Sequence, residues 1–201
     1  EEQKQKYLPK LCSGEHVGAL AMSEAEGVEG GADLLLQTII GYEPFHDVRL
    51  LAFPEFAHAA PIYDSVAKLR DRLAVELPNE HTDSYERLAR QYGCYIQTGS
   101  FLEIDPAWPD VVFNTTLLIG PDGILSRYRK VNPWIPWEVH ASPHDLPGYD
   151  EDPFPVARTE IGNLAAIASE EILYPEIARC MAMRGAEVFL HTTSQTNEVV
   201  R

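Results

Sequence analysis

Apolar segments of two kinds alternate along most of this chain, and the alternation restricts its fold more than any other feature. Short runs of β-branched, aromatic and aliphatic residues, typical of buried strands, are separated by longer segments with apolar residues at helical spacing. Strands are predicted over residues 48–53, 94–101, 113–119, 124–128, 164–168 and 187–191. Helices are predicted over residues 64–77, 83–92 and 175–184. Strands alternating with helices favour a layered α/β fold with a mixed sheet.

The ends of these elements carry local signals. Asp83, with Glu86 three residues later, suggests a capping box at the start of the second helix. Gly93 stands where that helix would end, and Pro175 suits the first position of the last helix. Residues 120–123 read Gly-Pro-Asp-Gly and predict a tight turn between the two strands of a hairpin.

The first thirty residues differ in composition from the rest. Residues 17–22 form a short apolar run that suits a buried strand. Residues 24–31 are acidic and rich in glycine, which is typical of a linker. We therefore expect an N-terminal extension with a linker at residues 1–31 and a larger domain at residues 32–201. Within that domain, six prolines between residues 133 and 155 mark a long loop, and loops of that length are usually functional.

The charge of the chain excludes several classes of partner. Sixteen Lys and Arg against thirty-one Asp and Glu give a net charge of -15 over 201 residues. Nucleic-acid binding requires clustered basic residues, and anionic membrane surfaces repel an acidic chain, so we expect neither partner. No apolar run approaches the roughly 20 residues that span a bilayer. Three scattered cysteines predict neither a disulfide framework nor a zinc site, and we expect a cytoplasmic protein.

Four polar residues lie at or near the ends of predicted strands, where layered α/β folds tend to place their sites. Glu55 follows the first of these strands, and Lys130 follows the hairpin. Ser169 follows a later strand, and Glu138 lies eight residues after Lys130. A carboxylate, an amine and a hydroxyl that converge would supply a base, a cation for a developing oxyanion and a nucleophile. Each also has an ordinary interpretation, as a solvated turn residue, a surface lysine or a helix N-cap.

Three strings occur in the order found in a known superfamily. They are Phe53-Pro54-Glu55, the run from Tyr128 to Trp134, and the run from Ser169 to Arg179. From about residue 32 to residue 200 the chain resembles the nitrilase superfamily of carbon–nitrogen hydrolases. The run from Lys130 to Glu138 is most similar to the aliphatic amidase and formamidase branch. The resemblance implies a four-layer α-β-β-α sandwich, here incomplete at both ends, and a Glu-Lys-Cys triad that needs no metal or organic cofactor.

The resemblance also implies roles for single residues. Glu55 corresponds to the general base, Lys130 to the cation that stabilises the oxyanion, and Glu138 to a glutamate that positions a small amide substrate. Trp134 is expected to line the same pocket. The activity implied is hydrolysis of a carbon–nitrogen bond in a small non-peptide amide through an acyl-enzyme.

The nucleophile position departs from the family pattern, because Ser169 stands where the family has cysteine. Cys94 opens a strand and Cys180 lies inside a helix, so neither replaces it by motif. A serine hydroxyl is harder to ionise than a thiol and needs a base placed for it. His191 is a weak candidate, since a structural histidine is the commoner case. Ser169 is either an engineered replacement or a natural variant, and the alternative function is a catalytically silent binding or assembly subunit.

Further residues bear on the substrate. Tyr63 and Trp137 could join Trp134 in walling a small pocket, although aromatic residues near prolines more often serve packing. Glu170 and Glu171 directly follow Ser169. If their side chains face the site, they disfavour anionic substrates by charge repulsion.

The two ends of the chain carry separate expectations. Residues 1–24 resemble acyl-CoA dehydrogenases of the isovaleryl-CoA type, but a segment this short cannot build a flavin site. Family members continue past the strand at residues 187–191, so the domain is expected to be truncated and to expose sheet edges. Family members also commonly form dimers through helices beside the site. By that resemblance, the helix Pro175 to Arg184 is the candidate interface of a homo-oligomer.

Overall fold

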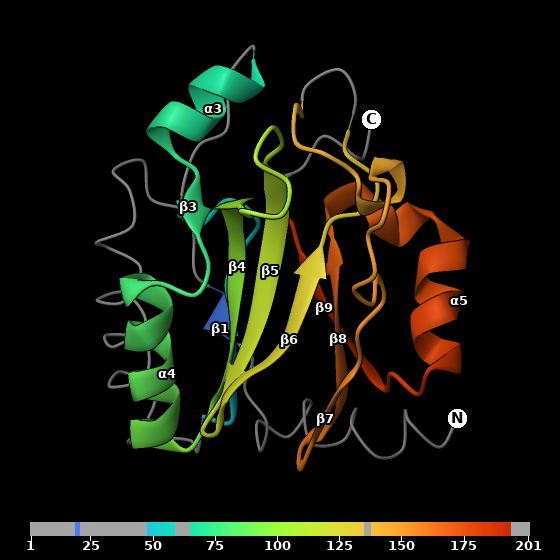
Figure 1. Ribbon diagram of the computed structural model, residues 1–201. Helices are drawn as coiled ribbons and strands as arrows, with labels where there is room; N and C mark the ends of the chain where they lie inside the picture. The colour runs from blue at the N-terminus through green and yellow to red at the C-terminus, as the bar shows by residue number, and fades with distance from the viewer. Residues whose placement is uncertain (1–18, 21–47, 59–64, 135–137, 194–201) are drawn as a thin grey trace, which may run out of the picture.

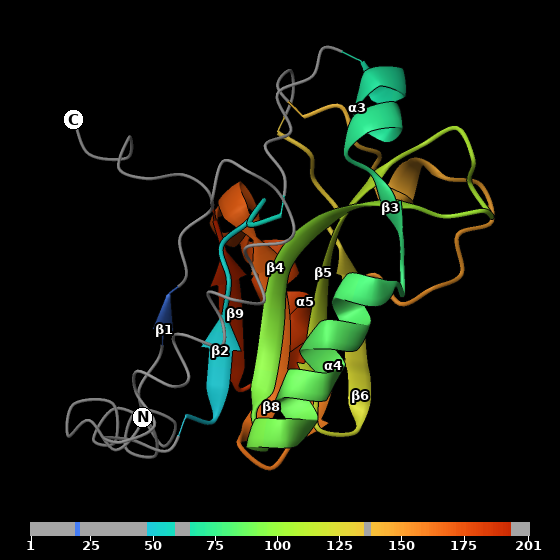
Figure 2. The same cartoon turned by 90° about the vertical axis from the view of Figure 1, so that its left-hand side faces the viewer.

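The computed structural model describes residues 19–20, 48–58, 65–134 and 138–193. Its centre consists of two β-sheets that face each other, with helices on the outer sides (Figure 1). Helix α4 (Glu80–Tyr92) covers the first sheet and α5 (Pro175–Met183) covers the second. Figure 2 shows α4 in front of the first sheet, seen from its outer side. These layers confirm the predicted α-β-β-α sandwich.

The first sheet is mixed, as the sequence predicts. Its strand order is β1-β2-β4-β5-β6, and β3 pairs separately with β4. The pairs β1–β2, β2–β4 and β3–β4 are parallel, whereas β4–β5 and β5–β6 are antiparallel. The bounds are β1 Ala19–Leu20, β2 Leu50–Ala52, β3 Val75–Glu76, β4 Tyr95–Ile104, β5 Phe113–Gly120 and β6 Gly123–Arg129.

The second sheet has three strands. Its order is β7-β8-β9, with β7 antiparallel and β9 parallel to β8. The bounds are β7 Ala157–Thr159, β8 Gly162–Ala168 and β9 Val188–Thr192. Two 3-10 helices lie in the connections, η1 (Pro143–Asp145) and η2 (Ser169–Leu173).

Apolar side chains fill the space between each pair of layers. Tyr85 and Leu88 of α4 pack with Ile96 and Leu117 of the first sheet. Between the sheets, Tyr95 and Leu118 pack with Leu164 and Leu190. On the far side, Ile177 and Met181 of α5 pack with Ala165 and Ile167 of β8. Burial of apolar surface, which contributes about 25 cal/mol per Å², therefore stabilises all three interfaces.

Two element boundaries differ from the prediction. Helix α4 begins at Glu80, because Asn79 accepts hydrogen bonds from the backbone of Thr82, and Thr82 Oγ1 accepts from Asn79 N. The predicted capping box at Asp83 and Glu86 is therefore wrong. The helix predicted over residues 64–77 is the shorter α3, Val66–Arg72. Residues 75–76 of the predicted helix instead form β3, because pairing with the end of β4 satisfies their backbone in an extended conformation.

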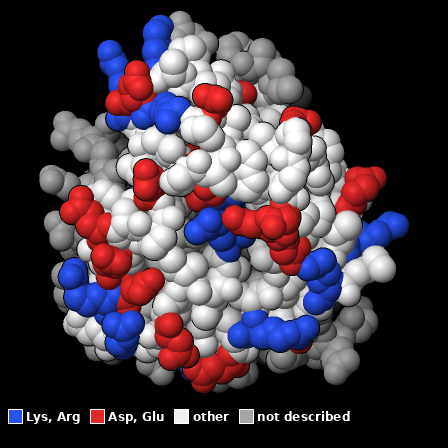
Figure 3. Space-filling view, in the orientation of Figure 1, with Lys and Arg blue, Asp and Glu red and all other residues white. Residues whose placement is uncertain are grey.

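Residues 19–20 pair with β2 in the first sheet, although the sequence assigns them to an N-terminal extension. The division of the chain at residues 31 and 32 stays a prediction. Within the described ranges, every helix is too short or too polar to span a membrane. Acidic and basic side chains are interspersed over the described part of the face in Figure 3, without a continuous basic patch.

Candidate active site

Glu55 lies in the turn that follows β2. Gly99 of β4 has a positive φ of 72°, and a Cβ there would lie 2.2 Å from the carbonyl oxygen of Pro54. Glycine therefore allows this turn to approach β4 closely. The turn is also held by a hydrogen bond of 2.8 Å from Phe56 N to Ser100 Oγ. The Glu55 side chain is only 1% exposed, and its Oε1 accepts a hydrogen bond of 3.0 Å from Asn114 Nδ2.

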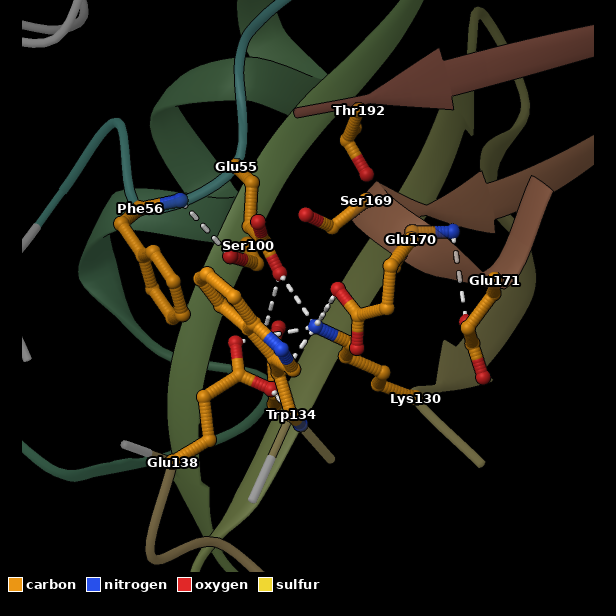
Figure 4. A network of polar contacts seen from close by, with 12 residues as sticks. Glu55, Phe56, Ser100, Lys130, Trp134, Glu138, Ser169, Glu170, Glu171 and Thr192 are labelled. Atoms are coloured by element: carbon orange, nitrogen blue, oxygen red, sulfur yellow. Dashed lines mark hydrogen bonds and ion pairs between the residues drawn. The ribbon is translucent and has the colours of Figure 1, made fainter. Parts of the chain in front are cut away.

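Lys130 follows β6 directly and contacts three carboxylates. Its backbone N–H donates to the Asn114 carbonyl at 2.8 Å, which continues the pairing with β5. Its fully buried Nζ lies 3.1 Å from Glu55 Oε1 and 2.8 Å from Glu138 Oε2. A third contact of 3.2 Å joins Nζ to Glu170 Oε2 (Figure 4). The predicted residues Glu55, Lys130 and Glu138 thus lie together, although 83 positions separate the first from the last.

The charges around Lys130 set the ionisation of the site. Burial lowers the pKa of Lys130, but the attraction of Glu55 and Glu138 outweighs it and raises the pKa above its usual value. Burial raises the pKa of Glu138 even though Lys130 opposes the shift. Burial and the charge of Lys130 together lower the pKa of the neighbouring His140 to about 3. At neutral pH the site therefore holds an ammonium group and a neutral imidazole.

Ser169 approaches from the second sheet, at the junction of β8 and η2. Its φ of 48° lies in the left-handed region, which is uncommon for any residue other than glycine. Figure 4 shows its hydroxyl pointing toward Glu55. The Ser169 hydroxyl, from the second sheet, therefore faces the Glu55 carboxylate, from the first sheet (Figure 4). His191 Nε2 lies 2.8 Å from the backbone oxygen of Ser169, so this ring nitrogen contacts the backbone of Ser169.

Glu170 and Glu171 diverge, and of the two only Glu170 faces the site. Glu170 contacts Lys130, whereas Glu171 is fully buried behind the site. Glu171 accepts hydrogen bonds from Tyr128 Oη at 2.6 Å and from the backbone N–H groups of Val131 and Asn132, both at 2.8 Å. Burial raises its pKa to about 7. Glu171 thereby joins the loop after β6 to the turn that carries Ser169.

Trp134 lies at the edge of this network. Its side chain is about half exposed, and its backbone N–H donates to Glu138 Oε2 at 2.6 Å. Figure 4 shows the indole ring beside Glu138 and Lys130. The other two predicted wall residues, Tyr63 and Trp137, lie outside the described residues.

Sequence reasoning missed two members of the site. Asn114, which contacts Glu55, is a buried polar residue at the start of an apolar strand, and that contrast was the available signal. His140 Nε2 lies 3.6 Å from Glu138 Oε2, and nothing local distinguishes it from other loop residues. Within the described residues, no cluster of three His, Cys, Asp or Glu side chains is arranged to hold a metal ion.

Comparison with known proteins identifies the family. The model of the carbon-nitrogen hydrolase family matches residues 17–200, which is most of the chain. The chain belongs to the carbon–nitrogen hydrolase family. This confirms the resemblance drawn from the three strings. The match begins at residue 17, fifteen positions before the boundary expected at residue 32, and it therefore includes β1.

Relatives of this carbon–nitrogen hydrolase include amidases and formamidases. A formamidase of Helicobacter acinonychis is 24% identical over 185 residues, which cover 89% of this chain and 51% of the relative. An amidase structure from Nesterenkonia sp. has a TM-score of 0.70 at 22% identity, covering 92% of this chain and 67% of that one. A carbon-nitrogen hydrolase from Helicobacter pylori has a TM-score of 0.71 at 19% identity, covering 91% and 63%. The chain spans about half the length of the curated relatives it matches.

Proposed function

We propose that this chain carries the acyl-transfer site of an amidase, with Ser169 as nucleophile, Glu55 as general base and Lys130 as oxyanion donor. The observation that supports it most is the buried Lys130 ammonium, which contacts Glu55 and Glu138 while the Ser169 hydroxyl points in from the facing sheet. A base, a nucleophile and a cation in one buried site are the parts that acyl transfer requires.

The reaction follows from these positions. Glu55 takes the proton of the Ser169 hydroxyl as Oγ bonds to the amide carbon, and the carbonyl electrons move to the oxygen beside Lys130. The carbon–nitrogen bond then breaks, and Glu55 gives its proton to the nitrogen, which leaves as ammonia or an amine. Water attacks the acyl-enzyme, with Glu55 taking its proton and returning it to Oγ. Glu138 and Trp134 orient the amide meanwhile.

Small neutral amides are the proposed substrates. Relatives named as formamidases and amidases support this class. The surplus of carboxylates over the single ammonium group also disfavours an anionic substrate.

A catalytically silent subunit is the second candidate, and the serine at position 169 is the observation that favours it. A structure of a glutamate-to-glutamine mutant of the Nesterenkonia amidase shows the result of Michael addition of acrylamide at the active-site cysteine of that enzyme. Acrylamide therefore offers a probe of the site here that does not depend on turnover, because a thiol at position 169 would add to it.

The test uses the Ser169→Cys variant, incubated with acrylamide and mapped by mass spectrometry. Cys180 is exposed, so it is first changed to serine to remove background labelling. We expect labelling at position 169 and ammonia release from formamide or acetamide, and we expect the ammonia release to be lost on adding Lys130→Ala or Glu55→Gln. Folded Ser169→Cys protein that labels but releases no ammonia would favour the silent subunit. Ammonia release unchanged by Glu55→Gln would refute the assignment of the base.

We further propose a homo-oligomer that uses the region of α5. Leu173, Tyr174 and Met183 are large apolar side chains that are 73%, 44% and 82% exposed near the two ends of this helix. Exposed apolar groups gathered at one place commonly mark an interface. Analytical ultracentrifugation of the chain and of Leu173→Glu tests this, and a monomer at every concentration would refute it.

A further inference from the structure

Lys130 has no hydrogen-bond donor left for a substrate in this structure. A lysine ammonium group carries three N–H donors. Three carboxylates surround it, with contacts to Glu55 Oε1 at 3.1 Å, Glu138 Oε2 at 2.8 Å and Glu170 Oε2 at 3.2 Å. One of these carboxylates must therefore leave before Lys130 can donate to an oxyanion.

We propose that Glu170 occupies the place on Lys130 that the substrate carbonyl oxygen takes, and that substrate binding displaces it. The proposal rests on the proposed function of Lys130 as oxyanion donor. Glu170 is thereby a specificity-determining residue that competes with weakly bound ligands. To bind, an amide must replace the Glu170 carboxylate at Lys130 with its own neutral carbonyl oxygen. Only a well-positioned substrate can make that replacement.

The other two carboxylates are held more firmly. Glu55 is 1% exposed in its side chain and also accepts from Asn114. Glu138 contacts Lys130 through both oxygens, at 2.9 and 2.8 Å, and accepts from Trp134 N. Each would lose a second partner on moving away.

Glu170 has the weakest attachment to Lys130. Of the three carboxylates, Glu170 lies farthest from Lys130 Nζ, at 3.2 Å. Its other oxygen, Oε1, is buried without a hydrogen-bond partner among the described residues. A buried acceptor without a partner gains by moving to water or to a ligand N–H. Its position next to Ser169 places it beside the carbon that the nucleophile attacks. An amide NH₂ could donate to Oε1 once the carboxylate has turned away from Lys130.

Binding of a neutral amide to the chain with its natural Ser169 tests the proposal without requiring hydrolysis. Ligand-observed NMR would measure the Kd of acetamide for the unchanged chain, Glu170→Gln and Glu170→Asp. Glu160→Gln is the matched control, because it removes the same charge from a side chain that is 72% exposed. Glu170→Gln should bind about tenfold more tightly, the effect of one hydrogen bond to a charged group.

The remaining variants separate contact from charge. Aspartate keeps the charge but is one methylene shorter, so Glu170→Asp should also bind more tightly if direct contact with Lys130 is the cause. Glu160→Gln should bind as the unchanged chain does. Equal binding by the unchanged chain and Glu170→Gln, weaker binding by Glu170→Gln, or no binding by either would overturn the proposal.

Turnover gives a separate outcome. In the Ser169→Cys background, Glu170→Gln should lower KM by about tenfold, in line with the gain in binding. If Ser169→Cys releases no ammonia but Glu170→Gln still tightens acetamide binding, the hydrolase proposal fails and the role of Glu170 stands. If ammonia is released and KM does not fall, the role of Glu170 fails and the hydrolase proposal stands.

Discussion

Arg129 and Lys130 are consecutive buried cations with different surroundings. Their side chains are 1% and 0% exposed, and successive residues of an extended segment point to opposite faces. Arg129 donates to both oxygens of Glu103, at 2.8 and 2.9 Å, and to Asp105. Its guanidinium carbon also lies 4.2 Å from the centre of the Phe113 ring. Arg129 is therefore held by a planar, two-pronged ion pair and by an aromatic face.

The two clusters differ in charge balance. Near Arg129, the guanidinium group of Arg127 lies 3.4 Å from Glu103. Two cations therefore share three carboxylates, those of Glu103, Asp105 and Glu151. Around Lys130, one ammonium group faces three carboxylates, and no second cation contributes among the described residues. The Arg129 cluster is therefore closer to charge balance and serves the fold, whereas the larger surplus of carboxylates at Lys130 is a strain of the kind found at functional sites.

Removing each cation in turn gives the largest expected effect. Arg129→Met should lower the free energy of unfolding by about 3–5 kcal/mol, because it leaves the buried Glu103 uncompensated. Lys130→Met should cost less, since the crowded carboxylates can take up a proton once the ammonium group is gone. Urea denaturation at pH 7 measures both. An equal loss for the two variants would contradict the distinction between a structural and a functional cation.

Glu171 is the structural carboxylate beside the functional Glu170. Glu171→Gln should cost about 1–3 kcal/mol, because the amide oxygen serves the N–H groups of Val131 and Asn132 and the new NH₂ group then faces the N–H of Ala168. Glu170→Gln should change stability much less. Thermal unfolding of the two variants provides the comparison. The distinction between the two neighbours would fail if Glu170→Gln were the more damaging change.

The sequence predicted which polar residues lie together better than it predicted the ends of the elements. Glu55, Lys130 and Ser169 each follow a strand within a short motif, so local sequence located them. Strand β3 was missed because two residues become a strand only through pairing with β4, a contact that depends on the whole fold. The start of α4 was missed because Asn79 and Asp83 both suit an N-cap, and only the backbone geometry selects Asn79.

Side-chain direction was the least predictable property of the site. Glu170 and Glu171 are chemically identical neighbours, and they separate because Ser169 adopts a positive φ of 48° before a tight 3-10 turn. Asn114 and His140 join the site through strand pairing and loop packing across the fold. No spacing rule in one sequence reports such contacts.

The pH dependence of stability between pH 7.5 and 5.5 should report on His140, which is buried beside Lys130. The pKa of His140 is lowered to about 3 by burial and by Lys130, so the folded chain keeps it neutral while the unfolded chain protonates it near pH 6.5. Its contribution to stability is therefore full above pH 6.5 and is lost as the pH falls toward 3. Between pH 7.5 and 5.5 the loss should be about 1.4 kcal/mol.

His140→Phe isolates this contribution, because it removes the titrating group and leaves no buried donor unpaired. Urea denaturation of both proteins at pH 7.5 and pH 5.5 should show a smaller loss for the variant. A matched change at the partly exposed His81, on α4, should leave the loss as it is in the unchanged chain. Identical pH dependence in His140→Phe and the unchanged chain would show that His140 is protonated in the folded state.

The smallest expected effect is on the free energy of unfolding, which Glu138→Gln and Glu103→Gln should change in opposite directions. Burial raises the pKa of Glu138, so its ionised form costs stability at neutral pH. Glu138→Gln should therefore stabilise the chain by about 0.5–1 kcal/mol, as changes that relieve strain at a functional site often do. Glu103→Gln removes the same charge from the balanced cluster and should destabilise the chain instead, because Arg129 loses half of its two-pronged ion pair.

The gain for Glu138→Gln should depend on pH in a defined direction. A carboxyl group whose folded pKa is raised costs stability above that pKa, and the cost disappears as the pH falls below the unfolded value near 4.5. Thermal unfolding at pH 8 and at pH 4.5 should therefore show a gain that is largest at pH 8. A loss of stability in Glu138→Gln at pH 8 would mean that three carboxylates suit Lys130 as well as Glu103 suits Arg129. The surplus charge at Lys130 would then have no functional meaning.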